Sequence, residues 1–147
     1  MKNEEFMLEA YKQAQKAKNN GEVPIGAIIV CDGKIIARGY NKREKSQNAI
    51  YHAEMIAINK ACKKLRSWRL ENCEIYVTLE PCLMCYGAII NSRIKKLYYG
   101  AKDNKAQIDK FILLSKNNSL NHNLEINEGI LEEKCSEILI NFFKGIR

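Results

Sequence analysis

Residues 74–91 read EIYVTLEPCLMCYGAIIN and predict a strand that runs directly into a helix. The first six residues are rich in β-branched and aromatic side chains, which favour a strand over residues 74–79. Pro81 follows, and its fixed φ suits the first turn of the helix that we expect over residues 82–91. A strand that passes at once into a helix is typical of an α/β fold.

The rest of the chain alternates between the same two kinds of element. Asp32-Gly33 separates two strand-like runs and is a strong signal for a β-hairpin. We expect strands over residues 25–31, 34–40, 94–99 (closed by Gly100) and 124–127, helices over 6–18, 52–65 and 130–144, a polar loop over 41–48, and a loop with a short helix over 104–115. This order predicts helices on both faces of a central sheet.

Length and composition predict one domain over residues 1–147. No linker or low-complexity tract divides the chain, of which 46% is hydrophobic and 28% charged. The longest apolar runs, such as residues 25–31, are far shorter than the ~20 residues of a membrane-spanning helix. The polar opening, residues 1–5, lacks the apolar stretch of a signal peptide. We therefore expect a cytoplasmic protein that does not associate with membranes.

Six cysteines occur without an export signal, so we expect thiols and not a disulfide framework. Four of them lie in or beside apolar segments at no recurring ligand spacing, which predicts side chains that fill the core. These four are Cys31, Cys62, Cys73 and Cys135. Only Cys82 and Cys85 are close together in the sequence.

Two fragments predict a metal site: His52-Ala53-Glu54 and Cys82-Leu83-Met84-Cys85, each at the start of a helix. Cysteines three apart at a helix start share one face. Two thiolates and one imidazole are the ligand count of a catalytic zinc ion, whose fourth position is left for water. Residues two apart do not share a helix face, so the ion is expected beyond the helix end, between two helix N-termini.

Glu54 is better suited to proton transfer than to zinc ligation, because zinc-bound water still needs a base that moves its protons. A lone Cys-x-x-Cys has two common alternatives, a redox dithiol and half of a structural zinc site. No second Cys-x-x-Cys exists to complete a structural site. The upstream His-x-Glu, in contrast, is what the signature of the zinc-dependent nucleobase deaminases requires.

The chain resembles the bacterial tRNA-specific adenosine deaminases of the cytidine deaminase-like superfamily over nearly its whole length. The resemblance lies in residues 21–27 (GEVPIGA), 37–41 (ARGYN), 52–54 (HAE), 67–70 (SWRL), 76–82 (YVTLEPC), 87–89 (GAI), 120–122 (LNH) and 142–143 (FF). It implies a cytidine deaminase-like three-layer fold with a five-stranded mixed sheet between helices. It also implies a homodimer, a zinc cofactor, and hydrolysis of the wobble adenosine in a tRNA anticodon stem-loop to inosine.

The same resemblance implies roles for four residues around the substrate. Asn41 would hydrogen-bond the flipped nucleoside, Pro24 and Leu79 would wall the base, and Asp103 would lie near the ribose. A structural role remains open for each: packing for Pro24 and Leu79, a solvated loop acid for Asp103, and a turn-forming side chain for Asn41.

Contacts with RNA are expected from the basic side chains and from the chain end. The net charge of +7 favours polyanions, although many basic proteins bind no nucleic acid. The candidates for phosphate contact are Lys42, Arg43, Lys63, Lys64, Arg66, Arg69, Lys102 and Lys105. Phe142-Phe143 would lie beside the anticodon loop, or would simply anchor the last helix in the core. Arg69, Lys105 and Phe143 are the RNA contacts that we single out.

Some residues depart from the family pattern. Residues 48–51 read NAIY where the family has Asp-Pro-Thr and a small residue, Leu83 replaces a common proline, and Tyr86 replaces a small residue. Tyrosines beside the base pocket would narrow it or supply a stacking surface. Two alternatives therefore stay open: a deaminase of free guanine, cytosine or a nucleoside, and a catalytically silent tRNA-binding protein. Glu54 argues against the silent protein, because a structural zinc site needs no such carboxylate.

Overall fold

The computed structural model describes residues 2–103 and 122–146. The elements follow the chain in the order α1 (Asn3–Asn19), β1 (Gly26–Cys31), β2 (Lys34–Tyr40), α2 (Arg43–Ser46), α3 (Ala53–Leu65), β3 (Cys73–Leu79), α4 (Leu83–Asn91), β4 (Lys96–Ala101), β5 (Glu125–Asn127) and α6 (Glu132–Gly145). The expected loop and short helix over residues 104–115 lie outside the described residues.

One five-stranded sheet forms the centre of the molecule, with the strand order β2-β1-β3-β4-β5. β1 runs antiparallel to β2 and to β3, whereas β3, β4 and β5 run parallel to one another. The hairpin turn between β1 and β2 has positive φ at both Asp32 (51°) and Gly33 (76°), which matches a type I′ turn. The predicted hairpin and mixed sheet are confirmed.

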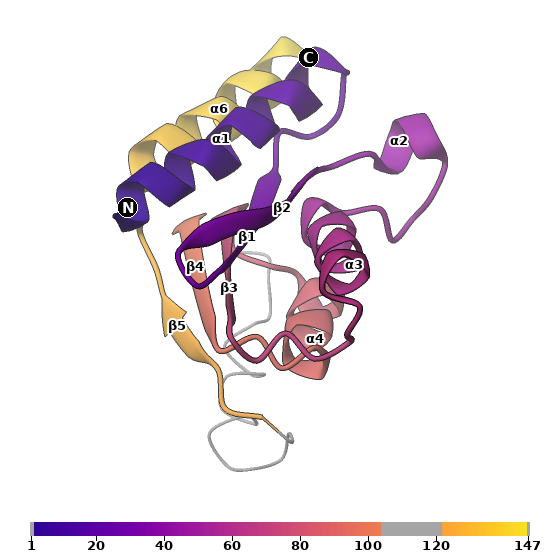
Figure 1. Cartoon of the computed structure of the whole chain (residues 1–147). Helices are drawn as coiled ribbons and strands as arrows, with labels where there is room; N and C mark the ends of the chain where they lie inside the picture. The colour runs from indigo at the N-terminus through magenta and orange to yellow at the C-terminus, as the bar shows by residue number, and fades with distance from the viewer. Residues whose placement is uncertain (1, 104–121, 147) are drawn as a thin grey trace.

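Helices cover both faces of the sheet, α1 and α6 on one side and α3 and α4 on the other (Figure 1). Side chains alternate between the two faces along each strand. On β1, Ile28 and Val30 pack toward α1 and α6, whereas Ala27 and Ile29 pack toward α3 and α4. The predicted three-layer arrangement is confirmed.

The helix α3 lies close against β2 because small residues face each other across the contact. Ala53 and Ala57 are fully buried on the inner face of the helix. A Cβ added to Gly39 would lie 2.5 Å from the carbonyl oxygen of Ala53 and 2.9 Å from the amide nitrogen of Ala57. Because residue 39 is glycine, the first turn of α3, which directly follows His52, can lie this close to β2.

Gly100 does not end β4, contrary to expectation. The strand begins at Lys96 and continues through Gly100 to Ala101. A Cβ on residue 100 would lie 2.5 Å from the sulfur of Cys135, so glycine allows α6 to pack closely on the strand.

Two other expectations change at the helix starts. Pro81 lies outside α4, because Cys82 has extended backbone angles and the helix begins at Leu83. Residues 43–46 form the one-turn helix α2 inside the segment that we expected to be a polar loop. Among the residues that the structure describes, no helix is long and apolar enough to span a membrane.

Candidate metal centre and active site

The two helices α3 and α4 begin side by side at the metal cluster. His52 is the residue before α3 and Cys82 is the residue before α4, and both have extended backbone angles. Cys85 lies in the first turn of α4. The ligand atoms of all three side chains lie within 4.8 Å of one another. The predicted position of the cluster, between two helix N-termini, is the one that the structure has.

The distances inside the cluster fit a tetrahedral zinc ion. Nδ1 of His52 lies 3.6 Å from Sγ of Cys82 and 3.5 Å from Sγ of Cys85. Zn–S bonds of about 2.3 Å and Zn–N bonds of about 2.05 Å at a tetrahedral angle separate sulfur from nitrogen by about 3.6 Å. The imidazole and the two sulfurs are therefore already spaced as ligands of one ion.

The protein environment prepares Cys82 to be a thiolate. Hydrogen bonds from the Cys85 thiol and from His52 outweigh burial and lower the pKa of Cys82 to about 4. The pKa of Cys85 is raised, because its proton is held by Cys82 and its sulfur is buried. The pKa of His52 is raised, chiefly by its hydrogen bond with Cys82. A cation that binds at this cluster displaces the remaining proton, since metals bind thiolates.

Glu54 lies next to the cluster in the first turn of α3 and is 4% exposed. Burial raises the pKa of its carboxyl group to about 7, although its own backbone amide, His52 and Cys85 oppose the shift. A carboxyl group with a pKa near neutrality both accepts and releases a proton at physiological pH. Its environment therefore fits the predicted role in proton transfer.

The four expected substrate residues lie at the same end of the sheet as the cluster. Leu79 ends β3 opposite Ala101 of β4, so Asp103 and Cys82 leave the sheet at one edge. The backbone amide of Asp103 donates to Oε1 of Glu80 (2.9 Å). Pro24 is buried, whereas Leu79 and Asp103 are half-buried. The topology thus places Pro24, Asn41, Leu79 and Asp103 at the end of the sheet where the cluster lies.

Asn41 is buried and its side chain has local partners. Its Oδ1 accepts from the amide of Arg43 and its Nδ2 donates to the carbonyl of Val23, both at 3.4 Å. The turn-forming alternative for Asn41 is thus present in the structure. Both bonds are long, and the amide group retains hydrogen-bonding capacity for a ligand.

Comparisons with known proteins agree with the chemistry of this cluster. The model of the MafB19-like deaminase family matches residues 1–147. The chain belongs to this family. The chain is 48% identical to the tRNA-specific adenosine deaminase of Bacillus subtilis (strain 168). The alignment spans 143 residues and covers 97% of this chain and 89% of that relative. The resemblance to the bacterial tRNA-specific adenosine deaminases is confirmed.

Two solved structures are also similar to this deaminase. One comes from a study of A-to-I editing by tRNA deaminases at the wobble position of transfer RNA; it is 39% identical with a TM-score of 0.86, and covers 92% of this chain and 99% of that chain. The other is a guanine deaminase from Bacillus subtilis, 43% identical with a TM-score of 0.67 over 69% of this chain and 66% of that chain. The fold is the one that tRNA and guanine deaminases share.

The sequence analysis of this deaminase missed the role of Glu22. Its side chain is 1% exposed. Its two carboxylate oxygens accept hydrogen bonds from the backbone amides of Glu44 (3.1 Å) and Lys45 (2.7 Å) in α2. Glu22 therefore holds the segment after Asn41 against the loop before Pro24. No local pattern reveals this partner, because the bonded residues are 22 and 23 positions apart.

The expected RNA contacts of the deaminase are spread widely. Arg69 lies beyond the C-terminal end of α3, whereas the cluster lies at its N-terminal end; 13 helical residues separate them by about 20 Å. Arg69 is exposed, paired with Glu71 (3.0 Å) and placed over the ring of Trp68. Phe143 is exposed near the end of α6 and meets Phe142 edge-on. Lys105 lies outside the described residues.

The two unusual tyrosines have different surroundings. Tyr86 is 1% exposed and packs in the core between the sheet and the helices α3 and α4, so it presents no stacking face to a ligand. Tyr51 is 37% exposed and directly precedes His52. Of these two tyrosines, only Tyr51 has an exposed surface that a ligand can contact.

Proposed function

We propose that the protein hydrolyses the wobble adenosine of a tRNA anticodon to inosine, with zinc held by His52, Cys82 and Cys85. The observation that carries this proposal is the spacing of one imidazole nitrogen and two thiols beside the buried carboxyl group of Glu54. A relative with 48% identity, named a tRNA-specific adenosine deaminase, supports the choice of substrate.

Zinc held by these three residues would supply Lewis acidity, which lowers the pKa of a bound water to about 7. Glu54 would take one proton from the attacking water and pass it to the ring nitrogen while the water oxygen bonds to C6 of the adenine. It would then take the second proton from that oxygen and pass it to the amine, so that the C6–N bond breaks, a C=O bond remains and ammonia leaves. Its pKa of about 7 allows both transfers at neutral pH. Burial around Glu54 keeps bulk water from competing for those protons.

The target base reaches this site only after it leaves the RNA stack. Pro24 and Leu79 then pack against its faces, Asn41 hydrogen-bonds the nucleoside, and Asp103 lies near the ribose. Leu79 is the last residue of β3, and the other three lie one or two residues outside strand ends at the same end of the sheet. Rigid strand ends hold such walls more firmly than free loops do.

The protein acts as a homodimer on the anticodon stem-loop in this proposal. Phe143 and Lys105 contribute contacts outside the base pocket. Arg69 contacts a phosphate only if the RNA reaches the far end of α3, where this side chain lies.

The second candidate is hydrolysis of free guanine. Its support is the guanine deaminase from Bacillus subtilis that is 43% identical over 69% of this chain. A free base has no phosphates and gains nothing from the charge of +7.

Incubation with bulk tRNA, an anticodon stem-loop and a panel of free bases separates the two candidates. We expect inosine at the wobble position and equimolar ammonia from the stem-loop, with no ammonia from guanine or cytosine. Turnover at subsaturating RNA should fall steeply as salt rises. Faster ammonia release from guanine, without salt dependence, would replace the first candidate with the second.

A further inference from the structure

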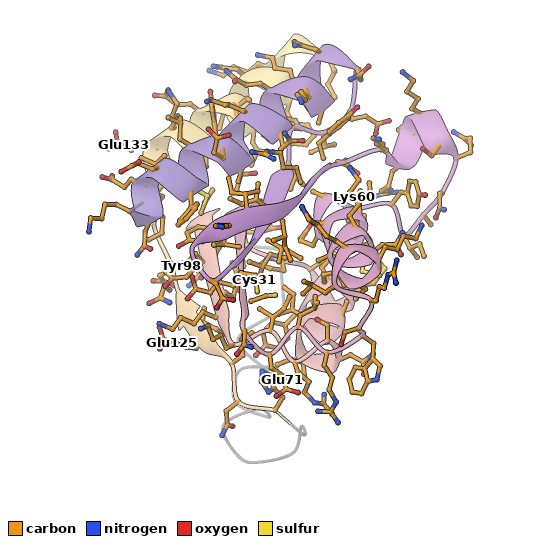
Figure 2. The ribbon with its side chains drawn as sticks, in the orientation of Figure 1. Cys31, Lys60, Glu71, Tyr98, Glu125 and Glu133 are labelled. Carbon is orange, nitrogen blue, oxygen red and sulfur yellow. The ribbon has the colours of Figure 1, made fainter. Side chains whose placement is uncertain are left out.

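Two cysteine thiols outside the metal cluster face each other at the hairpin end of the sheet. Cys31 is the last residue of β1 and Cys73 is the first residue of β3, and the antiparallel register pairs them directly. Both side chains belong to the face of the sheet that α3 and α4 cover, as do their neighbours Ile29 and Ile75. Cys31 lies beside the turn that leads into β2 (Figure 2). The proposed deamination uses neither thiol.

The backbone hydrogen bonds show that these two cysteines form a closely spaced pair. The amide of Cys73 donates to the carbonyl of Leu70 (3.0 Å), and its carbonyl accepts from the amide of Lys95 (3.1 Å). Both main-chain groups of Cys73 thus have partners other than Cys31, so the pair is of the non-hydrogen-bonded kind. Such pairs have Cα atoms about 4.5 Å apart, within the range of about 4.4–6.8 Å that a disulfide spans. The register therefore holds the two sulfurs where an S–S bond can form.

A pocket of about 540 Å³ gives small molecules access to the pair. It lies between the hairpin turn and the connection from α3 to β3, and its lining includes Cys31, Asp32 and Cys73. The exposed polar side chains of Ser67 and Glu71 also line it. Cys31 is half-buried, whereas Cys73 is fully buried. A small molecule that enters this pocket therefore meets the sulfur of Cys31 first.

The two thiols differ in a way that suits two consecutive steps of oxidation. The thiol of Cys31 donates a weak hydrogen bond to Oδ2 of Asp32 (3.9 Å), so an acceptor for its proton is present. Burial and the neighbouring Cys31 raise the pKa of Cys73 to about 12, so this thiol keeps its proton until its sulfur reacts. An accessible thiol with a second thiol beside it allows the second to resolve the sulfenic acid of the first.

We propose that Cys31 and Cys73 form a reversible disulfide when the protein meets a hydroperoxide. Sγ of Cys31 attacks one oxygen of the hydroperoxide, so that an S–O bond forms, the O–O bond breaks, and an alcohol or water leaves with the thiol proton. Sγ of Cys73 then attacks the sulfenic sulfur, so that the S–O bond breaks and water leaves with the second thiol proton. The two sulfurs together lose two electrons, which the hydroperoxide takes up.

Cys62 is the thiol that competes for either member of the pair. It is half-buried on α3 and packs against the same cluster of core side chains. A helix residue lacks the direct opposition that the register between β1 and β3 gives to Cys31 and Cys73. Two cysteines form a disulfide only where their Cβ atoms face each other at short distance. We therefore expect the bond to select the register pair and to leave Cys62 a thiol.

The test oxidises the zinc-loaded full chain and locates the new bond. Reduced protein is treated with an equimolar amount of hydrogen peroxide, the remaining thiols are alkylated after unfolding, and the peptides are analysed by mass spectrometry without reduction. Cys31→Ala and Cys73→Ala each remove one member of the pair. Cys62→Ala is the matched control, because it removes a neighbouring thiol and leaves the pair intact. The readout does not depend on deamination.

The unchanged protein and Cys62→Ala should each lose two hydrogen atoms and yield one linked pair of peptides, which carry Cys31 and Cys73. Dithiothreitol should restore both thiols. In Cys73→Ala the sulfenic acid of Cys31 should persist and be trapped by dimedone, whereas Cys31→Ala should give neither product. Because the bond closes the long loop between β1 and β3, the oxidised protein should also unfold several degrees above the reduced protein.

The absence of linked peptides, or peptides that join Cys62 to Cys31 or to Cys73, would overturn the inference. A disulfide between two copies of the chain would overturn it too. So would oxidation that links only Cys82 to Cys85 and leaves Cys31 and Cys73 open to alkylation. A bond between Cys31 and Cys73 that lowers the unfolding temperature would contradict the unstrained geometry from which the site is inferred.

Discussion

Two groups of cysteines lie at opposite ends of β3, and only one of them is suited to bind a metal. Cys31 and Cys73 face each other across β1 and β3 where β3 begins, and Cys62 packs nearby. Cys82 and Cys85 lie beyond the end of the same strand, at the start of α4. Both groups place thiols close together, so proximity alone does not make a ligand set.

The surroundings of the sulfurs separate the two groups. Burial and the neighbouring Cys31 raise the pKa of Cys73 to about 12, so this thiol keeps its proton. Hydrogen bonds from Cys85 and from the imidazole of His52, in contrast, lower the pKa of Cys82 to about 4. Helix N-termini also favour negative charge. His52, Cys82 and Cys85 are the only group of three or more metal-ligating side chains found among the described residues.

The strongest contrast is expected from alanine at one cysteine of each group. Cys85→Ala should lose nearly all bound zinc and all measurable deamination, whereas Cys73→Ala should keep about one zinc per chain. Metal analysis of the purified variants, with the unchanged protein as reference, checks this. Zinc that persists in Cys85→Ala but disappears in Cys31→Ala or Cys135→Ala would show that the ligands are assigned to the wrong sulfurs.

Glu54→Gln should nearly abolish deamination at the metal cluster but leave metal binding intact. The amide neither accepts nor delivers a proton, so turnover should fall about 10²- to 10⁴-fold while zinc content is unchanged. Glu125→Gln, an exposed carboxylate on β5, is the control. A loss within about tenfold, worth about 1.4 kcal/mol in the barrier, would remove Glu54 from the central role.

Alkylation of the zinc-free protein compares the two groups by their thiolates. Cys82, with a pKa of about 4, is ionised from pH 6 to 8, so its rate should be nearly flat across this range and fall only on acidification toward pH 4. Cys73 should react at least tenfold more slowly at pH 7. Mass spectrometry of timed samples identifies the labelled residues. Preferential labelling of Cys73 would show that the reactive thiolate had been assigned to the wrong group of cysteines.

The smallest effect is expected on stability. Cys73→Ala removes one buried sulfur and should lower the free energy of unfolding by about 1 kcal/mol, with turnover within about twofold of the unchanged protein. Urea denaturation of zinc-loaded protein measures this. A large loss of turnover without a loss of stability would mean that the group of Cys31, Cys62 and Cys73 takes part in function.

The sequence was sufficient for features whose signals are local. Asp32-Gly33 specified the hairpin, because few other dipeptides accept positive φ at both positions. The spacing of Cys82 and Cys85, together with His-x-Glu, specified the cluster because a metal site demands particular donors.

Features that depend on distant partners could not be predicted in the same way. A glycine such as Gly100 locally resembles a strand end. Its absent side chain instead leaves room for Cys135 of α6, 35 residues later in the chain. The helix α2 is held by Glu22, which its own four residues do not reveal. Tyr86 seemed to border the pocket, yet the pitch of α4 turns it into the core.

X-ray absorption at the zinc edge of the purified protein tests the metal centre most directly. The account predicts two sulfur neighbours at about 2.3 Å, one imidazole nitrogen at about 2.0–2.1 Å, and one further light-atom neighbour. The spacing of His52 Nδ1 from the two sulfurs, 3.6 and 3.5 Å, already fits this shell. A shell of four sulfurs, or one without sulfur, would contradict the assignment of His52, Cys82 and Cys85 as the ligands.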